Sequence, residues 1–246
     1  MKISGNRPFS KALKGIRQPS LIFKCLYKKF CLPMLPKRIR ARKTLGKYRS
    51  YSQAYQDIFV LEMLGKKECG LYVEIGAYDE IDHSNTYILE TQFRWHGISI
   101  EIDAQAARDF NAVRQNKCIC VDATRYDFGK FFEESKYPKQ LDYLSLDIEP
   151  AFQTMAVLKR LPLDSYRFSV ITYEHDMYVS GPEFMRASRE LLQSRGYQLV
   201  ASNVCWEGRN FEDWYVDPAM VAEEIWTKYL SNNMDCSRIF ELAGVV

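Results

Sequence analysis

Carboxylates stand at the ends of the first apolar segments of this chain, next to a single glycine. The segment Leu71–Ile75 carries Glu74 and is followed directly by Gly76, and the segment 97–102 carries Glu101, about 25 residues farther on. In α/β proteins such a glycine lets the backbone approach a ligand, and a carboxylate at the end of the next strand accepts hydrogen bonds from ribose hydroxyls. The spacing therefore predicts a nucleoside site.

The same placement of acids continues along the chain. Six carboxylates lie at or near the ends of the first five predicted strands: Glu74, Glu101, Asp122, Asp147, Glu149 and Glu174. Ligands of open α/β sheets bind beyond the carboxyl ends of the strands. A single acid in such a place also serves to cap a helix or begin a turn, but the set as a whole favours a site.

The residues after Gly76 indicate which nucleoside fits. Of the three glycines in the dinucleotide pattern G-x-G-x-x-G only Gly76 is present, and Glu80 stands near the third position. An acid at a helix start repels a pyrophosphate, which binds at the positive end of the helix dipole. A ligand with a positive centre and no phosphate, such as S-adenosylmethionine, fits better. The predicted cofactor contacts are Glu101 at the ribose, Asp122 and Ala123 at the adenine edge, and Glu74, Gly76 and Ala77 at the methionine part.

Strand and helix patterns alternate from residue 51 onward. The predicted strands are 71–75, 97–102, 117–121, 141–147, 168–174, 197–203 and 214–216. The predicted helices are 53–64, 84–93, 104–115, 126–134, 152–160, 182–194 and 218–230. This alternation predicts an α/β fold with a Rossmann-like, doubly wound, mostly parallel seven-stranded sheet.

Charge divides the chain into a basic leader, residues 1–50, and an acidic domain, residues 51–246. The leader holds 15 of the 34 Lys and Arg residues and none of the 31 Asp and Glu residues, so the domain carries 19 − 31 = −12 charges. An acidic domain argues against nucleic acid as a partner. The leader suits an anionic membrane surface, and a solvated, disordered arm is the alternative.

The leader contains no segment long enough to span a membrane, because lysines interrupt its most apolar stretch, residues 20–32. The seven cysteines form no CxxC pair, which favours reduced thiols and a cytoplasmic protein, with peripheral contact at the inner membrane face through the leader. Only three histidines are present, which argues against a zinc cluster.

Several short motifs resemble the FkbM-type methyltransferases, a branch of the class I S-adenosylmethionine-dependent enzymes. They occur in the family's order at 52–57, 73–77, 84–86, 97–101, 142–149, 173–175 and 211–216. The tract Asp142–Glu149 is the most specific of them. Two departures concern the site, because the family usually has glycine where Glu80 and Pro150 stand here.

The resemblance implies transfer of a methyl group to a hydroxyl oxygen, whose proton must leave. His175 is the first candidate base, because an imidazole takes up a proton near neutral pH. Glu174 and Asp147 lie on the same predicted side, and Mg²⁺ held by Asp147, Glu149 and Glu174 is the alternative route. Of these candidates, His175, Glu174 and Asp147 are taken as catalytic and none as an established metal ligand.

The resemblance also implies an acceptor, a hydroxyl of a sugar in a glycan or glycolipid. The specific case is 2-O-methylation of fucose on a lipo-chitooligosaccharide nodulation factor. One alternative is O-methylation of a macrolide or another secondary metabolite. A second is a non-catalytic binding or scaffold protein on a methyltransferase fold, in which Glu80 and Pro150 mark a degenerated site.

Overall fold

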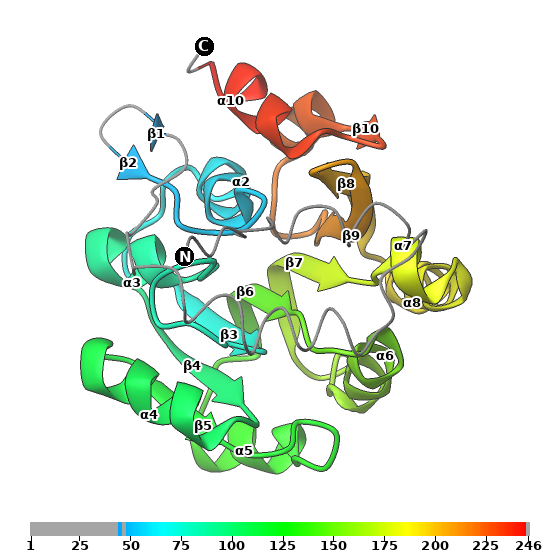
Figure 1. The fold of residues 1–246 in the computed structure, drawn as a ribbon. Coiled ribbons are helices and arrows are strands. Elements are labelled where there is room, and N and C mark those ends of the chain that lie inside the picture. The colour runs from blue at the N-terminus through cyan, green and yellow to red at the C-terminus, as the bar shows by residue number, and fades with distance from the viewer. Residues whose placement is uncertain (1–43, 46–47, 245–246) are drawn as a thin grey trace, which may run out of the picture. The chain divides into compact units, whose positions relative to one another are not determined.

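One mixed sheet organises the chain in a computed structural model that describes residues 44–45 and 48–244 (Figure 1). The described residues belong to the compact unit Ile39–Val246. In spatial order the eight strands of this sheet are β10 (Ser231–Asn232), β8 (Gln198–Trp206), β9 (Arg209–Val216), β7 (Arg167–Glu174), β6 (Gln140–Leu146), β3 (Leu71–Ile75), β4 (His96–Glu101) and β5 (Lys117–Cys120). A separate antiparallel pair joins β1 (Thr44–Leu45) and β2 (Tyr48–Arg49).

The strand directions confirm the predicted fold class. Strands β3 to β7 are parallel, and β9 runs antiparallel between β7 and β8. The hairpin joining β8 to β9 turns at Glu207 and Gly208, which both have positive φ, as a two-residue type I′ turn requires. This α/β, Rossmann-like sheet, with one antiparallel strand third from its end, is the class I methyltransferase fold.

The helices alternate with the strands in the central part of the chain, as predicted. Their bounds are α2 (Gln56–Met63), α3 (Tyr87–Phe93), α4 (Ala104–Val113), α5 (Phe128–Glu134), α6 (Ala151–Arg160), α7 (Met177–Ser180), α8 (Glu183–Ser194), α9 (Glu223–Trp226) and α10 (Ile239–Leu242), with the 3₁₀ turns η3 (Thr227–Tyr229) and η4 (Cys236–Arg238). Within the described part of the chain, no helix has the length and apolar character needed to cross a bilayer.

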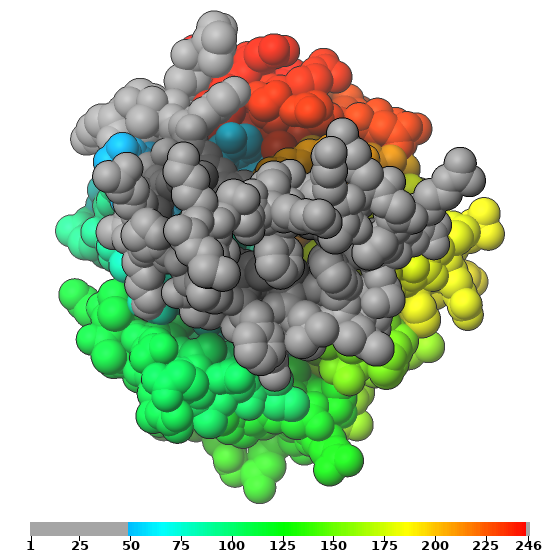
Figure 2. Space-filling model, in the orientation of Figure 1, coloured from blue at the N-terminus to red at the C-terminus, as the bar shows by residue number. Residues whose placement is uncertain are grey.

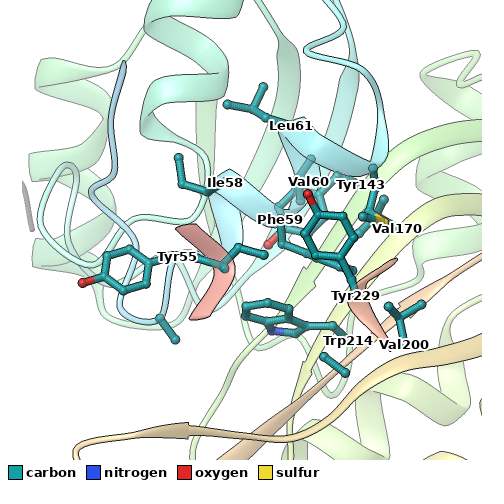
Figure 3. Close-up of a cluster of buried hydrophobic side chains, with 14 of the residues drawn as sticks. Tyr55, Ile58, Phe59, Val60, Leu61, Tyr143, Val170, Val200, Trp214 and Tyr229 are labelled. Atoms are coloured by element: carbon teal, nitrogen blue, oxygen red, sulfur yellow. The ribbon is translucent and has the colours of Figure 1, made fainter. Parts of the chain in front are cut away.

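Two apolar layers bury the two faces of the sheet. On one face α2 packs against β6, β7 and β9, and Phe59 stacks on Trp214 with ring centroids 4.6 Å apart (Figure 3). On the other face Phe132 of α5, Leu158 of α6 and Leu192 of α8 are buried together. Each such side chain contributes about 1.5–3 kcal/mol of burial free energy. The sheet is thereby held rigid up to its strand ends, where the predicted site residues lie.

The predictions for the C-terminal part were wrong in two details. The sheet has an eighth strand, β10, and the predicted helix 218–230 is replaced by a turn, the short α9 and η3. The break lies at Ala222, whose backbone is extended with a ψ of 141° before α9, while Asp217 accepts from the Ala219 N–H and binds Arg167 in the preceding turn. The acid thus closes a turn at the point where the helix was expected. Figure 2 shows the C-terminal part of the chain, in orange to red, at the surface.

Candidate active site

The candidate site lies where the direction of the sheet connections reverses. From β3 the chain passes outward through β4 to β5 and then returns to β6 on the other side of β3. Ligands of open α/β sheets bind in the crevice at such a switch point, beyond the carboxyl ends of the strands. The two segments that border it begin at Gly76, after β3, and at Asp147, after β6.

Gly76 forms the tight turn that follows β3 at the candidate site. Its φ is +95°, and a Cβ built on it would lie 1.7 Å from the carbonyl oxygen of Asp147. The N–H groups of Gly76 and Ala77 both donate to the carbonyl of Ile100, at 2.9 and 3.2 Å. No side chain fits at position 76, because the neighbouring backbone fills the space.

Glu101, at the end of β4, is fixed by two backbone donors. Its Oε2 accepts from the Tyr78 N–H at 2.9 Å, and its Oε1 accepts from the Asp103 N–H at 2.8 Å. A carboxylate has about four acceptor positions, so each oxygen keeps capacity for a further hydrogen bond. The side chain is 9% exposed at the sheet edge. This arrangement suits a pair of ribose hydroxyls.

Glu74 lies deeper than its neighbours, inside the face covered by α3. It accepts hydrogen bonds from the hydroxyls of Ser99, at 2.6 Å, and Thr86, at 3.0 Å. Burial raises the pKa of Glu74, and the charge of Arg114 opposes this rise. In the described residues its side-chain contacts are internal, and they anchor the segment that begins α3.

Arg114 was not predicted as a site residue, yet it organises the loop after β3. Its side chain is completely buried and donates to Glu90, at 2.8 Å, and to the backbone carbonyl of Glu80, at 3.0 Å. It also donates to the hydroxyls of Ser84, at 3.1 Å, and Thr86, at 3.0 Å. The contacts span 24 to 34 positions in sequence, which is why helix patterns alone do not reveal them.

Glu80 and Pro150, the departures from the family pattern, fit the backbone without strain. Glu80 does not have a positive φ, so its position does not require glycine, and its carbonyl is used by Arg114. Pro150 directly precedes α6, with a φ of −81°, and its carbonyl accepts from the Gln153 N–H at 2.8 Å. Neither residue distorts the turn at Gly76.

Asp122 and Ala123 follow β5 at the same edge of the sheet. Asp122 Oδ1 accepts from the Thr124 N–H, at 2.9 Å, and from the Thr124 hydroxyl, at 2.6 Å, which lowers the pKa of Asp122. Ala123 is buried in the apolar layer beneath β5 and β6. Asp122 therefore shapes its own turn, and its role at an adenine edge stays a prediction.

His175 lies just beyond β7, with Nδ1 hydrogen-bonded and Nε2 facing the carboxylate of Asp213. Its Nδ1 accepts from the Met177 N–H at 3.2 Å, and its Nε2 lies 3.4 Å from Asp213 Oδ1. Burial alone would raise the pKa of Asp213, but hydrogen bonds from Arg189 and His175 outweigh it and lower that pKa to about 2. The carboxylate is therefore charged where it faces Nε2. Because Nδ1 accepts from the Met177 N–H, its lone pair is not open to a substrate proton.

Glu174 and Glu212 form a buried pair directly opposite each other in the β7–β9 ladder. They are 3% and 1% exposed, and Glu212 Oε2 accepts from Gln56 Nε2 at 2.9 Å and Trp214 Nε1 at 2.7 Å. Burial is the main cause that raises the pKa of Glu212 to about 8, and the charge of Glu174 raises it further. Sequence reasoning did not single out Glu212, whose partner Gln56 is 156 positions away.

The backbone of Asp147 packs against the Gly76 turn at the end of β6. Its N–H donates to the Ile75 carbonyl at 2.9 Å, and its own carbonyl packs against Gly76. Its side chain is half-buried, whereas Glu174 and His175 are buried. Within the described ranges, no group of three or more His, Cys, Asp or Glu residues is arranged to hold a metal ion, so the Mg²⁺ alternative gains no support there.

A separate cavity of about 520 Å³ lies near the amino ends of β6 and β7. Its lining includes Gln140, at the start of β6, with Asp142, Ser169 and Met220. Since ligands of open α/β sheets bind at the carboxyl ends of the strands, this cavity is not the candidate active site.

Comparisons with known proteins agree with the fold. No protein-family model matches the chain, and no curated protein does. A Klebsiella pneumoniae structure described as an O-methyltransferase has a TM-score of 0.49 and 13% identity, over 84% of this chain and 93% of that one. Aeropyrum pernix fibrillarin, solved with bound S-adenosylmethionine, has a TM-score of 0.45 and 15% identity over 69% and 78%. The resemblance to FkbM-type enzymes stays a prediction.

The expectation that nucleic acid is not a partner requires correction. A structure from Pyrococcus horikoshii described as an RNA methyltransferase has a TM-score of 0.41 and 15% identity over 66% of this chain and 79% of that one. Because similar structures include RNA methyltransferases, the exclusion was wrong. The argument from charge failed because the net charge of a domain does not describe the local charge where a polyanion binds.

Proposed function

We propose that this chain is an S-adenosylmethionine-dependent methyltransferase that acts on a hydroxyl group. The observation that carries the proposal is Glu101, held by two backbone N–H groups beside the Gly76 turn, at the switch point of a class I methyltransferase sheet. Glu101 binds the ribose hydroxyls, and the Gly76 turn lies under the methionine part.

The charges around the crevice suit this ligand. S-Adenosylmethionine supplies a methyl group activated by a positively charged sulfur. Glu101 and Asp147 lie at strand ends on either side of β3, and a carboxylate favours a cation over a phosphate. The residues of the site thus fit a cationic, phosphate-free nucleoside.

Asp147 is the residue that we assign as the acceptor of the hydroxyl proton. It borders the crevice and is half-buried, whereas the His175 lone pair is occupied by the Met177 N–H. His175 is then a positioning residue within the pair that it forms with Asp213. Holding the hydroxyl in line with the methyl group supplies much of the rate in such a reaction, and a base adds about 10²–10⁴-fold.

The acceptor that the family resemblance suggests is a sugar hydroxyl in a glycan or glycolipid, with the fucose of a nodulation factor as the specific case. A secondary metabolite is the alternative acceptor. Both offer an alcohol that is a weak acid, so both require the same positioned base. The position of the base therefore does not distinguish the two acceptors, and direct transfer assays are needed to identify the acceptor.

Isothermal titration calorimetry with S-adenosylmethionine and S-adenosylhomocysteine tests the cofactor. We expect binding by the full chain and at least 10-fold weaker binding by Glu101→Ala, which removes charged hydrogen bonds to the ribose. A folded protein that binds neither ligand at millimolar concentration would leave only the non-catalytic alternative. Transfer of a radiolabelled methyl group to oligosaccharides, glycolipids or RNA then identifies the acceptor, and labelling of RNA alone would reject the sugar.

A further inference from the structure

Asn85 presents a buried oxygen at the switch point of the sheet. The residue is 6% exposed, and its Nδ2 donates to Ser145 Oγ of β6 at 2.9 Å. Ser145 lies directly opposite Glu74 in the β3–β6 ladder. The amide is therefore held between the two strands that border the crevice.

The Oδ1 atom of Asn85 has no hydrogen-bond partner among the described residues. Most buried polar side-chain atoms in proteins have one, because leaving a carbonyl oxygen without a donor forfeits its hydration. A buried acceptor of this kind, next to a candidate ligand site, calls for a donor from outside the chain.

The neighbours of Asn85 hold it in this position. Thr86 donates to the carboxylate of Glu74 at 3.0 Å, and Ser84 accepts from Arg114 at 3.1 Å. Three consecutive side chains are thus tied to three places in the fold: the residue that follows α4, β6 and β3. The amide of Asn85 is pre-organised, so a ligand that binds it does not first have to order it.

Building on the proposed function, we propose that Asn85 binds the amino group of the amino-acid end of S-adenosylmethionine through Oδ1. Glu101 fixes the ribose at the end of β4, on the far side of β3 from β6, so an extended ligand reaches Asn85 with its other end. That end carries an ammonium group with three donors and no acceptor, which complements a lone carbonyl oxygen.

Two probes that differ only in the amino-acid end test this assignment by calorimetry. S-Adenosylhomocysteine carries the ammonium group, and 5′-methylthioadenosine has the same nucleoside without it. In Asn85→Leu, which keeps the shape and removes the oxygen, we expect at least 10-fold weaker binding of S-adenosylhomocysteine and unchanged binding of 5′-methylthioadenosine. Asn85→Asp, which keeps an acceptor oxygen, should bind S-adenosylhomocysteine at least as tightly as the wild type.

Two further variants separate the possible failures. Asn116→Leu removes an amide that donates to Tyr72 and Trp95, away from the crevice, and should leave both affinities unchanged. Glu101→Ala should weaken both probes. If Asn85→Leu weakens both probes equally, or neither, the assignment of Asn85 is wrong while the proposed function stands. If the wild type binds neither probe, the proposed function itself fails.

Discussion

At the residue scale, the buried carboxyl of Glu212 should make stability depend on pH. Its pKa in the folded chain is about 8, above the ordinary value of 4.5. A carboxyl whose pKa is raised by folding makes its full contribution to the free energy of unfolding when the pH is below its pKa in the unfolded chain. This contribution is lost as the pH rises through about 8, the pKa in the folded chain. Glu212→Gln keeps a carbonyl oxygen for Gln56 and Trp214 and cannot ionise. Denaturation in urea should show the variant more stable than the wild type at pH 9 and no more stable at pH 5.

A matched variant checks that this effect comes from burial. Glu241 is exposed on α10, and Glu241→Gln should leave the pH dependence unchanged. Asp213, the next residue to Glu212, has its pKa lowered to about 2, so its contribution is present above pH 4 and lost only in stronger acid. If Glu212→Gln follows the wild-type pH curve, Glu212 is ionised in the folded chain at neutral pH.

The two candidate bases should respond differently to substitution. Asp147→Asn should lower kcat by about 10²–10⁴-fold and leave the affinity for S-adenosylhomocysteine within about threefold, because only the proton acceptor is lost. His175→Ala should instead lower the free energy of unfolding by about 1–3 kcal/mol, because the buried Asp213 loses a donor. Single-turnover kinetics and urea denaturation measure these effects. A His175→Ala protein of normal stability without turnover would restore the histidine as base.

At the scale of elements, the turn after β3 should not tolerate any side chain at position 76. Gly76→Ala would force a Cβ against the Asp147 carbonyl at a residue whose φ is +95°, so we expect a loss of at least about 2 kcal/mol in stability. The matched control is Gly129→Ala in α5, where the nearest atom lies 3.6 Å from the new Cβ. It should gain up to about 1 kcal/mol from helix propensity. Equal urea midpoints for the two variants would contradict the close approach of β3 and β6.

The elements that sequence patterns predicted well are those whose signal is local. Five parallel strands are apolar runs separated by helices, so their positions along the chain and their terminal acids could be predicted. The C-terminal part could not, because the turn that replaces the expected helix is tied to Arg167, 50 positions away from Asp217. Arg114 and Glu212 were missed for the same reason. Sequence patterns identify residues at strand ends, such as Glu101. They do not identify the distant partners of a side chain, and those partners decide whether Glu74 or His175 is open to a ligand.

At the scale of the whole molecule, the leader carries the strongest separation of charge in the chain. Its cationic character, beside a domain of −12 charges, supports the proposal of peripheral attachment to an anionic membrane. Each Lys or Arg near such a surface contributes about 1 kcal/mol at low salt, within a Debye length of about 10 Å. The full chain should therefore sediment with vesicles that contain phosphatidylglycerol. Raising the salt concentration from about 0.1 M to about 0.5 M should release it.

Deletion of residues 1–43 removes 13 of the 15 leader cations, since Lys47 and Arg49 remain, and keeps Ser50, which donates to Asp57. The shortened chain should lose vesicle binding and keep its affinity for S-adenosylhomocysteine, because the site residues all follow position 73. Vesicles of phosphatidylcholine control for non-electrostatic adsorption. Retained binding to anionic vesicles after deletion would place the contact on the domain, and displacement of the full chain from them by RNA would show that the leader recognises charge and not lipid.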